Sequence, residues 1–331
     1  MATLLDEIAG PGDTVLDPLG GVGTVAFEAA LSGRFAWSND LSPLAFLVAR
    51  GKLAPPTLTQ AEAAIDDLAD QLARVRLSED DWAAAEFGLN ARVVDYFHSA
   101  TLADVLRARK LLRDDSDPSP TRAFIWACLL HVLHGNRPYA LSRTSHPITP
   151  FNPRGPFVEK DLVRSVRAKA RRALAVDLPS GFCPAQSLHG DFRALPDRLA
   201  EPVDVVLTSP PFLGMRFDRP NWLRLWFCGW EAAAFHHTRS GGFLERQQVR
   251  DRSCYREFFR VCSDVIKPSG TLVVHVGAGS KGDLGSELLR LAGDEFVLEA
   301  DVEEQVDNLE RHGLSDKRLT VRQHLLVFAR R

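Results

Sequence analysis

The chain has 331 residues, with 40 Lys plus Arg against 43 Asp plus Glu, and 45% of its residues are hydrophobic. This length and composition allow one large domain or two smaller ones with a sizeable core, and they exclude a globally disordered chain. The net charge of −3 provides no overall positive field, so a nucleic-acid partner would need a local basic patch.

The cysteines and the N-terminal segment indicate in which cellular compartment the protein is expected. The five cysteines are odd in number and form no CxxC pair, which argues against a disulfide scaffold and favours a reducing, cytoplasmic environment. The N-terminal segment MATLLDEIAGPGD is acidic and lacks an apolar run, so no signal peptide is expected. No stretch approaches about 18 uncharged apolar residues, so neither a transmembrane helix nor a membrane partner is expected.

Residues 1–54 have the pattern of a βαβ unit. Hydrophobic period and helix-ending residues predict these elements in chain order: helix 2–9, strand 14–16, helix 25–31, strand 35–38 and helix 43–49. A glycine-rich turn joins the first strand to the second helix, as such a unit requires.

Residues 55–182 are rich in Ala, Leu and Arg at helical spacing. Helices are predicted at about 61–72, 92–113, 121–134 and 159–175, and residues 136–156 are predicted to be an extended loop. No strand signal here is strong enough to extend a sheet. We interpret this segment as a mainly helical insertion that includes a possible target-recognition region.

Strands and helices alternate again over 183–331. Strands are predicted at 185–188, 203–207, 271–276, 296–302 and 324–329, and helices at 255–266 and 283–291. Lys267-Pro268-Ser269-Gly270 is expected to stop the first of these helices. The alternation on both sides of the insertion predicts an α/β fold with a doubly wound sheet.

The glycine-rich turn suggests a nucleotide-like cofactor. Gly21-x-Gly23-x-x-Ala26 matches the form GxGxxG/A, and Asp40 follows at the end of the next strand. This pattern fits NAD, FAD or S-adenosylmethionine, and a tight turn without a ligand would also explain it. Asp17 lies directly before the glycines, where its carboxylate would repel a pyrophosphate but suit the ammonium group of S-adenosylmethionine.

A Ser-Pro-Pro-Phe sequence, Ser209 to Phe212, follows the predicted strand 203–207. Two prolines cannot continue a central strand, because neither has an N–H to donate, so they form a rigid turn at the strand's carboxyl end. The turn presents a hydroxyl, a proline carbonyl and an aromatic ring. This set suits a flat base with an exocyclic amine, since the ring can stack on the base while the oxygens accept the amine hydrogens.

These two motifs resemble those of the DNA amino-methyltransferases. The run from Asp17 to Thr24 is similar to their DPFxGxGT motif, with Leu19 in place of Phe, and Ser209 to Phe212 is similar to (D/N/S)PP(Y/F). The resemblance covers roughly residues 10–50 and 183–331. It implies a Rossmann-like methyltransferase sheet and S-adenosylmethionine as cofactor. Only about a dozen residues precede the first strand, so we expect that, relative to the family, the chain is permuted or trimmed, or that the role of the family's preceding segment falls elsewhere, for example to the C-terminal stretch.

The resemblance also implies roles for individual residues. The residues implied to bind the cofactor are Asp17, Pro18, Gly20, Gly21, Gly23, Thr24, Asn39, Asp40, Asp191 and Phe192. The residues implied to hold and activate the acceptor base are Ser209, Pro210, Pro211 and Phe212. Asp191 also fits a plain turn, and it follows the predicted strand 185–188, where it could accept from the cofactor's adenine amino group.

Cationic and aromatic residues elsewhere are candidates for substrate contact. We select Arg143 in the predicted loop, and Arg216 and Trp222 after the proline turn, although Trp222 also fits a core position. A basic helix could follow phosphates or be an ordinary solvated face; its cations are Lys160, Arg164, Arg167, Lys169, Arg171 and Arg172.

No metal site is predicted. Cys128, His131 and His134 recur every three residues, but on a helix the last pair diverges and no fourth ligand is evident, so a packing role is favoured. His236-His237 has no partner at ligand spacing and is interpreted in the same way.

The sequence thus predicts an S-adenosylmethionine-dependent methyltransferase that acts on an exocyclic amine of a flipped-out DNA base, as in restriction-modification, with cytosine N4 favoured over adenine N6. An RNA base or a small planar amine is the alternative substrate. An NAD-dependent oxidoreductase and a catalytically idle binding module are further alternatives, and the first of these leaves the proline turn unexplained. The target sequence and the oligomeric state are not predicted.

Overall fold

The computed structural model describes residues 2–235, 242–279, 282–305 and 320–331. The chain forms two compact units, each described by itself below. The first comprises residues 1–49, 179–215 and 241–331, and the second comprises residues 50–178 and 216–240. Across the described ranges, no helix is both long and apolar enough to span a membrane.

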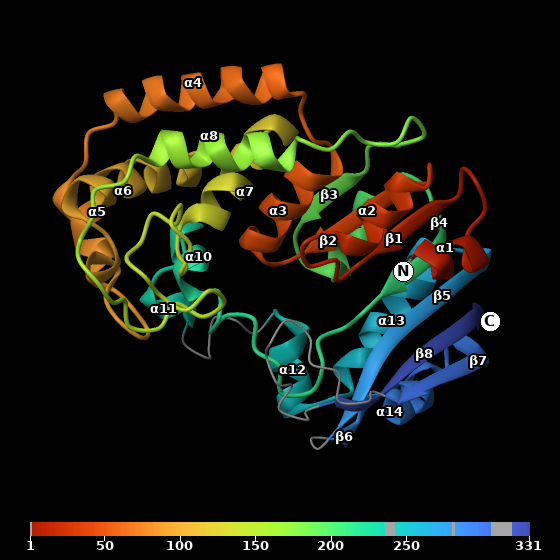
Figure 1. Cartoon of the computed structure of the whole chain (residues 1–331). Coiled ribbons are helices and arrows are strands. Elements are labelled where there is room, and N and C mark those ends of the chain that lie inside the picture. Colours follow the sequence, from red (N-terminus) through yellow and green to blue (C-terminus); the bar gives the residue numbers. More distant parts are fainter. Residues whose placement is uncertain (1, 236–241, 280–281, 306–319) are drawn as a thin grey trace. The chain divides into compact units, whose positions relative to one another are not determined.

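The first unit is built on a sheet of eight described strands (Figure 1). These are β1 (Thr14–Asp17), β2 (Phe35–Asp40), β3 (Gln186–His189), β4 (Val203–Thr208), β5 (Ile266–Gly279), β6 (Gly282–Asp283), β7 (Phe296–Gln305) and β8 (Thr320–Arg330). Their order is β3-β2-β1-β4-β5-β8-β7, with β6 paired to β5. The strands from β3 to β5 are parallel, whereas β8 is antiparallel to β5 and β7.

This topology confirms the predicted doubly wound, Rossmann-like sheet with a helical insertion. The chain moves outward from β1 to β2 and β3, then returns to place β4 on the other side of β1. Ligands of open α/β sheets bind at the carboxyl ends of the strands where the order reverses. In this sheet that place is the junction of β1 and β4.

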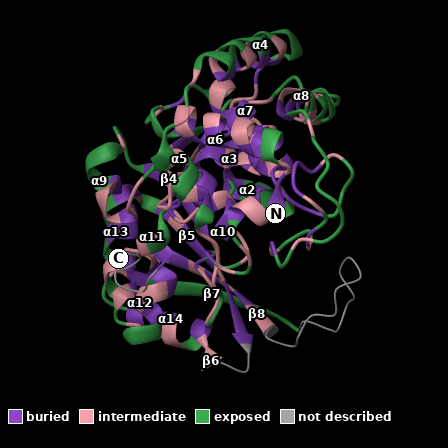
Figure 2. Ribbon diagram, turned by 90° about the vertical axis from the view of Figure 1, so that its left-hand side faces the viewer, coloured by how far each residue is buried: buried purple, intermediate pink, exposed green. Residues whose placement is uncertain are grey.

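Helices cover both faces of the sheet. They are α1 (Ala2–Ile8), α2 (Thr24–Leu31), α3 (Pro43–Leu53, which continues into the second unit), α9 (Leu195–Arg198), α12 (Leu244–Arg250), α13 (Cys254–Val265) and α14 (Leu284–Ala292). The main core joins the apolar sides of α13 and α14 to one face of β1, β4, β5 and β8, including Leu16 and Val206. Figure 2 shows β5 buried along much of its length.

The helix before Lys267–Gly270 ends as predicted, since α13 stops at Val265, but the segment itself belongs to β5, which the sequence predicted to begin only at Thr271. Val203 of β4 pairs with Ile266, and Val205 already pairs with Thr271, so the extra residues form an irregularity within the strand pair. A Cβ on Gly270 would lie 2.7 Å from the carbonyl oxygen of Asp204. The turn-forming residues therefore make a close approach between strands.

The second unit is helical over its described part. Its helices are α4 (Leu58–Arg74), α5 (Glu79–Ala83), η1 (Ala84–Glu86), η2 (Val93–Tyr96), α6 (Ser99–Arg113), α7 (Pro120–Val132), α8 (Leu162–Ala173), α10 (Trp222–Phe227) and α11 (Ala232–Phe235). Thr57 and Gln60 form a capping box that starts α4, whose buried side is apolar and whose remainder is exposed (Figure 2). The Tyr96 hydroxyl donates to the carbonyl of Pro150 at 2.6 Å and so anchors the predicted loop.

Residues 216–240 lie in this second unit, whereas the sequence placed them in the third segment, 183–331. The reason is their apolar content. Trp222 and Trp226 of α10 are fully buried, and their indole N–H groups donate to the carbonyls of Pro150 at 3.2 Å and Ala84 at 3.0 Å.

Candidate functional site

The ends of β1 and β4 meet where the two sequence motifs begin. The Thr208 hydroxyl, at the end of β4, donates to Oδ1 of Asp17, at the end of β1, over 2.7 Å. Parallel pairing of Val15 with Val205 and of Leu16 with Val206 sets this alignment. Ser209 directly follows Thr208, so the glycine-rich motif and the proline turn start side by side at the switch point of the sheet.

Asp17 is an almost fully buried carboxylate, with 4% of its surface exposed. Its Oδ1 also accepts from the backbone N–H of Leu19 at 3.1 Å. Burial disfavours the charged form and raises the pKa of Asp17 to about 7, against the smaller lowering effect of the Thr208 hydroxyl. A cation placed beside this carboxylate would restore its ionised form, so the group is suited to hold an ammonium.

The glycine turn is shaped by its own backbone. The N–H of Gly23 donates to the carbonyl of Gly20, and the N–H of Gly20 donates to that of Asn39, both at 2.8 Å. A Cβ on Gly20 would lie 2.0 Å from Oγ of Ser38, so only glycine fits there. Gly21 has φ +52° and open space where a Cβ would point, which leaves backbone accessible to a ligand.

Thr24 and Pro18, also predicted to bind the cofactor, flank this turn. Thr24 is the first residue of α2, directly after Gly23 with φ +70°. The carbonyl of Pro18 accepts from the side-chain amide of Asn39 at 3.1 Å. Both residues therefore lie within the loop that joins β1 to α2.

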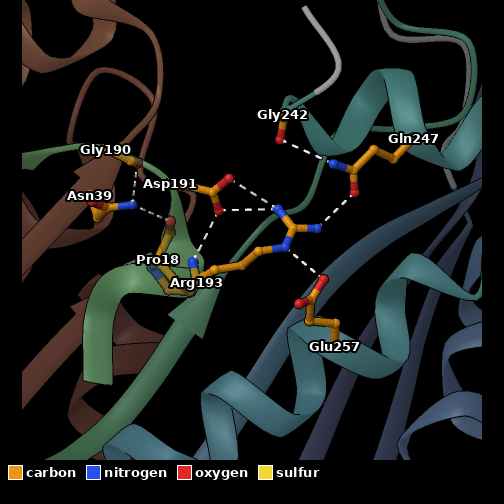
Figure 3. Close-up of polar contacts among 8 residues, drawn as sticks. All are labelled: Pro18, Asn39, Gly190, Asp191, Arg193, Gly242, Gln247 and Glu257. Atoms are coloured by element: carbon orange, nitrogen blue, oxygen red, sulfur yellow. Dashed lines mark hydrogen bonds and ion pairs between the residues drawn. The ribbon is translucent and has the colours of Figure 1, made fainter. Parts of the chain in front are cut away.

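Two polar residues at the end of β2 close the turn. Asp40 accepts from the N–H of Gly21 at 2.9 Å and from that of Ser42 at 2.7 Å, and burial raises the pKa of its carboxyl. The Asn39 amide donates to the carbonyls of Pro18 and Gly190, while its Oδ1 is buried with no partner (Figure 3). Each oxygen of Asp40 keeps a lone pair that could accept from a ribose hydroxyl.

Asp191 follows β3, and Arg193 holds its carboxylate in place (Figure 3). The Arg193 guanidinium donates to both Asp191 oxygens at 3.1 Å, to Glu257 at 2.6 Å and to Gln247 at 2.8 Å. The same guanidinium lies over the ring of Phe192, 4.6 Å from its centroid. Sequence reasoning selected Asp191 and missed Arg193, whose partners come from the distant helices α12 and α13.

The proline turn borders a cavity of about 350 Å³, within the usual size range of small-ligand sites. Ser209 is exposed and lines the cavity, and Pro210 behind it is buried. The carbonyl of Pro211 accepts from the side-chain amide of Gln248 at 3.0 Å, which fixes the turn. Phe212 contacts His275 edge-on, with ring centroids 6.1 Å apart. The lining residues are Leu4, Val25, Leu207, Thr208, Ser209, His275, Val302, Glu304, Gln323 and Leu325.

Strand register explains the far wall of this cavity, which the sequence analysis did not identify. His275 pairs with Leu325, and Gln323 pairs with Glu304, so these side chains lie on one face of β5, β8 and β7. Nε2 of His275 lies 3.1 Å from Oε1 of Gln323. The sequence does show polar residues at alternate positions of apolar strands. It does not show which strands pair, and that pairing is what brings these residues together.

The three candidate substrate residues belong to the second unit. The Arg143 guanidinium donates to the carbonyls of Gly155 and Asp95 and lies over the ring of Phe157. Arg216 pairs with the buried Asp218 at 2.8 Å. Trp222 is fully buried, which supports its interpretation as a core residue and leaves no face for stacking on a base.

The basic helix, α8, pairs much of its charge with other groups of the second unit. Arg167 and Arg171 both pair with Glu62, and Arg167 also pairs with Asp66. Arg172 lies over the ring of Tyr139, 4.2 Å from its centroid. Lys160, which precedes the helix, donates to the carbonyls of Ala140 and Ser142. These four cations therefore have partners within the protein, and the choice between a phosphate-binding face and a solvated face stays a prediction.

Of two sets of metal-ligand residue types, only the set on β7 and β8 comes within ligand spacing among the described residues. Cys128 and His134 are buried, and burial raises the pKa of Cys128 to about 12 and lowers that of His134 to about 3, so both stay neutral as packing groups would. On β7 and β8, Asp301, Glu303 and His324 approach ligand spacing, but Arg322 pairs with Glu303 at 3.1 Å and already supplies positive charge. His236-His237 lies outside the described residues.

No protein-family model matches the chain, and no curated protein matches it in sequence. Among solved structures, TrmN from Thermus thermophilus has 14% identity and a TM-score of 0.36. The alignment covers 99% of this chain but 47% of TrmN, so the chain spans about half the length of that protein.

Two further solved structures show similar values. A TehB-like SAM-dependent methyltransferase from Corynebacterium glutamicum has 11% identity and a TM-score of 0.37, with 100% of this chain and 86% of that one covered. The rRNA methyltransferase aviRa from Streptomyces viridochromogenes has 13% identity and a TM-score of 0.35, with 98% and 80% covered. Likeness at this level leaves the function to be inferred from the residues of the site.

Proposed function

We propose that this protein is an S-adenosylmethionine-dependent methyltransferase that modifies an exocyclic amine of a nucleobase, with DNA as substrate and cytosine N4 favoured over adenine N6. The observation that carries the proposal is the hydrogen bond of 2.7 Å between Thr208 and Asp17. It brings the predicted cofactor loop and the predicted acceptor turn, which are far apart in sequence, to adjacent strand ends.

The residues at the β1 and β2 ends fit the cofactor. Gly21 offers open backbone, Asn39 has a buried oxygen without a partner, and Asp17 is a carboxylate suited to an ammonium group. A pyrophosphate cofactor such as NAD would bring negative charge toward Asp17, which disfavours the oxidoreductase alternative. When bound, S-adenosylmethionine supplies a sulfonium-activated methyl group.

The residues at the β4 end fit the acceptor. An exocyclic amine on a base is a poor nucleophile, because its lone pair is delocalised into the ring. The Ser209 hydroxyl and the carbonyl of Pro210 can accept its two hydrogens, which favours a pyramidal nitrogen and orients the lone pair. Phe212 supplies a ring for stacking, and the catalytic effect expected is positioning rather than covalent catalysis.

An RNA base or a small planar amine remains the second candidate substrate. The chain has a net charge of −3, and the arginines of α8 pair with Glu62 and Asp66, so the described part offers less free cationic surface than a long DNA contact needs. The alternative changes the acceptor and keeps the same chemistry.

Adjacent residues allow a matched test. Purified protein is incubated with tritiated S-adenosylmethionine and DNA, RNA or free nucleosides, and products are identified by nucleoside mass spectrometry. Ser209→Ala is expected to lower turnover about 100-fold and leave the affinity for S-adenosylhomocysteine, measured by calorimetry, unchanged. Thr208→Val, one residue earlier, is expected mainly to weaken cofactor binding.

Three outcomes would decide between the alternatives. Methylated RNA or nucleoside without methylated DNA would select the second candidate. Equal loss of turnover and cofactor affinity in Ser209→Ala would make the turn structural. Binding of NADH and not of S-adenosylhomocysteine would overturn the proposal.

A further inference from the structure

The far wall of the cavity beside Ser209 carries polar groups that neither motif explains. His275, Gln323 and Glu304 come from three neighbouring strands and line the same cavity as Ser209. The rest of that sheet face contributes the apolar residues Val302 and Leu325. Polar side chains on an otherwise apolar pocket wall are the groups that set ligand orientation and specificity.

The contacts of Gln323 favour one orientation of its amide. Its Oε1 lies 3.1 Å from Nε2 of His275, which can donate when that nitrogen carries the proton. Glu304 lies directly opposite Gln323 in the strand register and, when ionised, offers only acceptors. The contact with His275 holds the Gln323 oxygen and leaves its NH₂ group as the donor available to the cavity, an orientation that the acceptors of Glu304 on the paired strand also favour.

We infer that Gln323, oriented by His275 and Glu304, selects the acceptor base. This inference rests on the proposed function. In cytosine and adenine, the ring nitrogen next to the exocyclic amine is a hydrogen-bond acceptor. In guanine, the ring nitrogen between the amine and the carbonyl is an N–H donor. With the amine held at Ser209, an amide donor in the same cavity matches the Watson–Crick edge of cytosine or adenine and opposes that of guanine. The other ring nitrogen beside the guanine amine is an acceptor, but it lies on the sugar side of the base.

The size of the cavity agrees with this assignment. A volume of about 350 Å³ lies at the small end of the usual range for ligand sites, so it suits a flipped-out base better than a base pair. Gln323 is half-buried, so a hydrogen bond made there is partly shielded from water. Gln323 is therefore a specificity-determining residue that does not touch the transferred methyl group.

The decisive variant is Gln323→Glu, which has nearly the same shape and replaces the donor by an acceptor. We expect kcat/KM for cytosine or adenine substrates to fall about 10- to 100-fold. The fall for guanine-containing substrates is expected to be smaller or absent, so preference shifts toward guanine. Affinity for S-adenosylhomocysteine is expected to stay unchanged. Gln323→Met, which retains volume without a donor, provides a second measurement if the carboxylate disturbs folding.

Glu303→Gln is the matched control. It makes the reverse exchange, of a carboxylate for an amide, at a position of β7 that lies on the opposite face of the sheet. Glu303 pairs with Arg322 and approaches His324, away from the cavity lining. The Glu303→Gln variant is expected to have the same base preference as the wild type. Oligonucleotides with a single adenine, cytosine or guanine acceptor, analysed by nucleoside mass spectrometry, give the preference directly.

The outcomes separate this inference from the proposed function. Wild-type protein that transfers no methyl group to any nucleobase would overturn both. Wild-type transfer with unchanged preference and kcat/KM in both Gln323 variants would overturn only the role of Gln323. Wild-type transfer chiefly to guanine N2 would also overturn that role, while methyl transfer to an exocyclic amine would stand.

Discussion

The two sides of the candidate site are built in different ways. On the side formed by β1 and β2, the backbone of Gly20 and Gly21 shapes the loop. Main-chain N–H groups and the Thr208 hydroxyl hold the carboxylates of Asp17 and Asp40. The side formed by β4, β5, β8 and β7 is a cavity lined by side chains. Hence substitutions in the cofactor loop, or at Thr208, which holds Asp17, should affect the ability to bind a cofactor. Substitutions elsewhere on the second side should alter rate and choice of substrate.

The largest effect is expected for Gly20→Ala. The added Cβ would lie 2.0 Å from Oγ of the buried Ser38 and 3.3 Å from the carbonyl oxygen of Asp17, so the Ser38 side chain or the turn itself must shift. Overpacking of this kind costs about 1–3 kcal/mol, and S-adenosylhomocysteine affinity is expected to fall at least about 100-fold by calorimetry.

Gly12→Ala, in the loop before β1 and outside the site, is the control, because its Cβ would meet open space and the cost is confined to the positive φ of 82°. Its unfolding free energy, measured by urea denaturation, is expected to change by about 1 kcal/mol. If the two variants bind the cofactor equally well, the backbone description of this side is wrong.

This contrast also marks what the sequence could predict. Glycines and prolines act on their own backbone, so the turn from Asp17 to Thr24 and the carboxyl-end position of Ser209 could be predicted from local chemistry. The topology followed from the alternation of strands and helices. Residues such as Arg193 and Gln323 depend on partners far along the chain, and local patterns carry no information about those pairings.

The sequence also did not predict the acidic partners of the basic helix, because these partners lie far away along the chain. The arginines of α8 suggested a phosphate-binding face, but Glu62 and Asp66, about a hundred positions earlier, pair with Arg167. The sequence favoured a core position for Trp222 over a place in the substrate pocket, and Trp222 is buried.

A smaller effect, with a distinctive pH dependence, is expected for Asp17→Asn. The pKa of Asp17 is raised from 3.8 to about 7, so the folded protein binds more protons than the unfolded chain between these values. Wild-type unfolding free energy should therefore fall as pH rises through about 4–7 and level off above it, by an amount on the order of a few kcal/mol. The variant should lack the part of this decline that Asp17 causes, so at pH 8 its unfolding free energy should rise relative to that of the wild type.

The effect of Asp17→Asn on cofactor affinity should be the opposite of its effect on stability: at high pH the variant should bind the cofactor more weakly than the wild type. At pH 8 the ionised Asp17 attracts the cofactor's ammonium, so the variant should bind S-adenosylhomocysteine about 10-fold more weakly. At pH 5.5 the two proteins should differ less, because wild-type Asp17 is then protonated before binding. Calorimetry at both pH values tests the affinity, and urea denaturation tests the stability. If the affinity of the wild type and of the variant for S-adenosylhomocysteine changed with pH in the same way, Asp17 would not face the ammonium.

The smallest effect is expected for Arg193→Met, which keeps a stem over Phe192 and removes the guanidinium that holds Asp191. The ion pairs with Asp191 and Glu257 are partly exposed, so stability should fall by no more than about 1 kcal/mol. Affinity for S-adenosylhomocysteine should fall a few-fold, because the Asp191 carboxylate loses its fixed orientation. Arg256→Met is the control, since Arg256 pairs only at the surface with the exposed Asp294. An Arg193 variant that binds like this control would show that the β3 end contributes to the cofactor side through backbone alone, as β1 and β2 largely do.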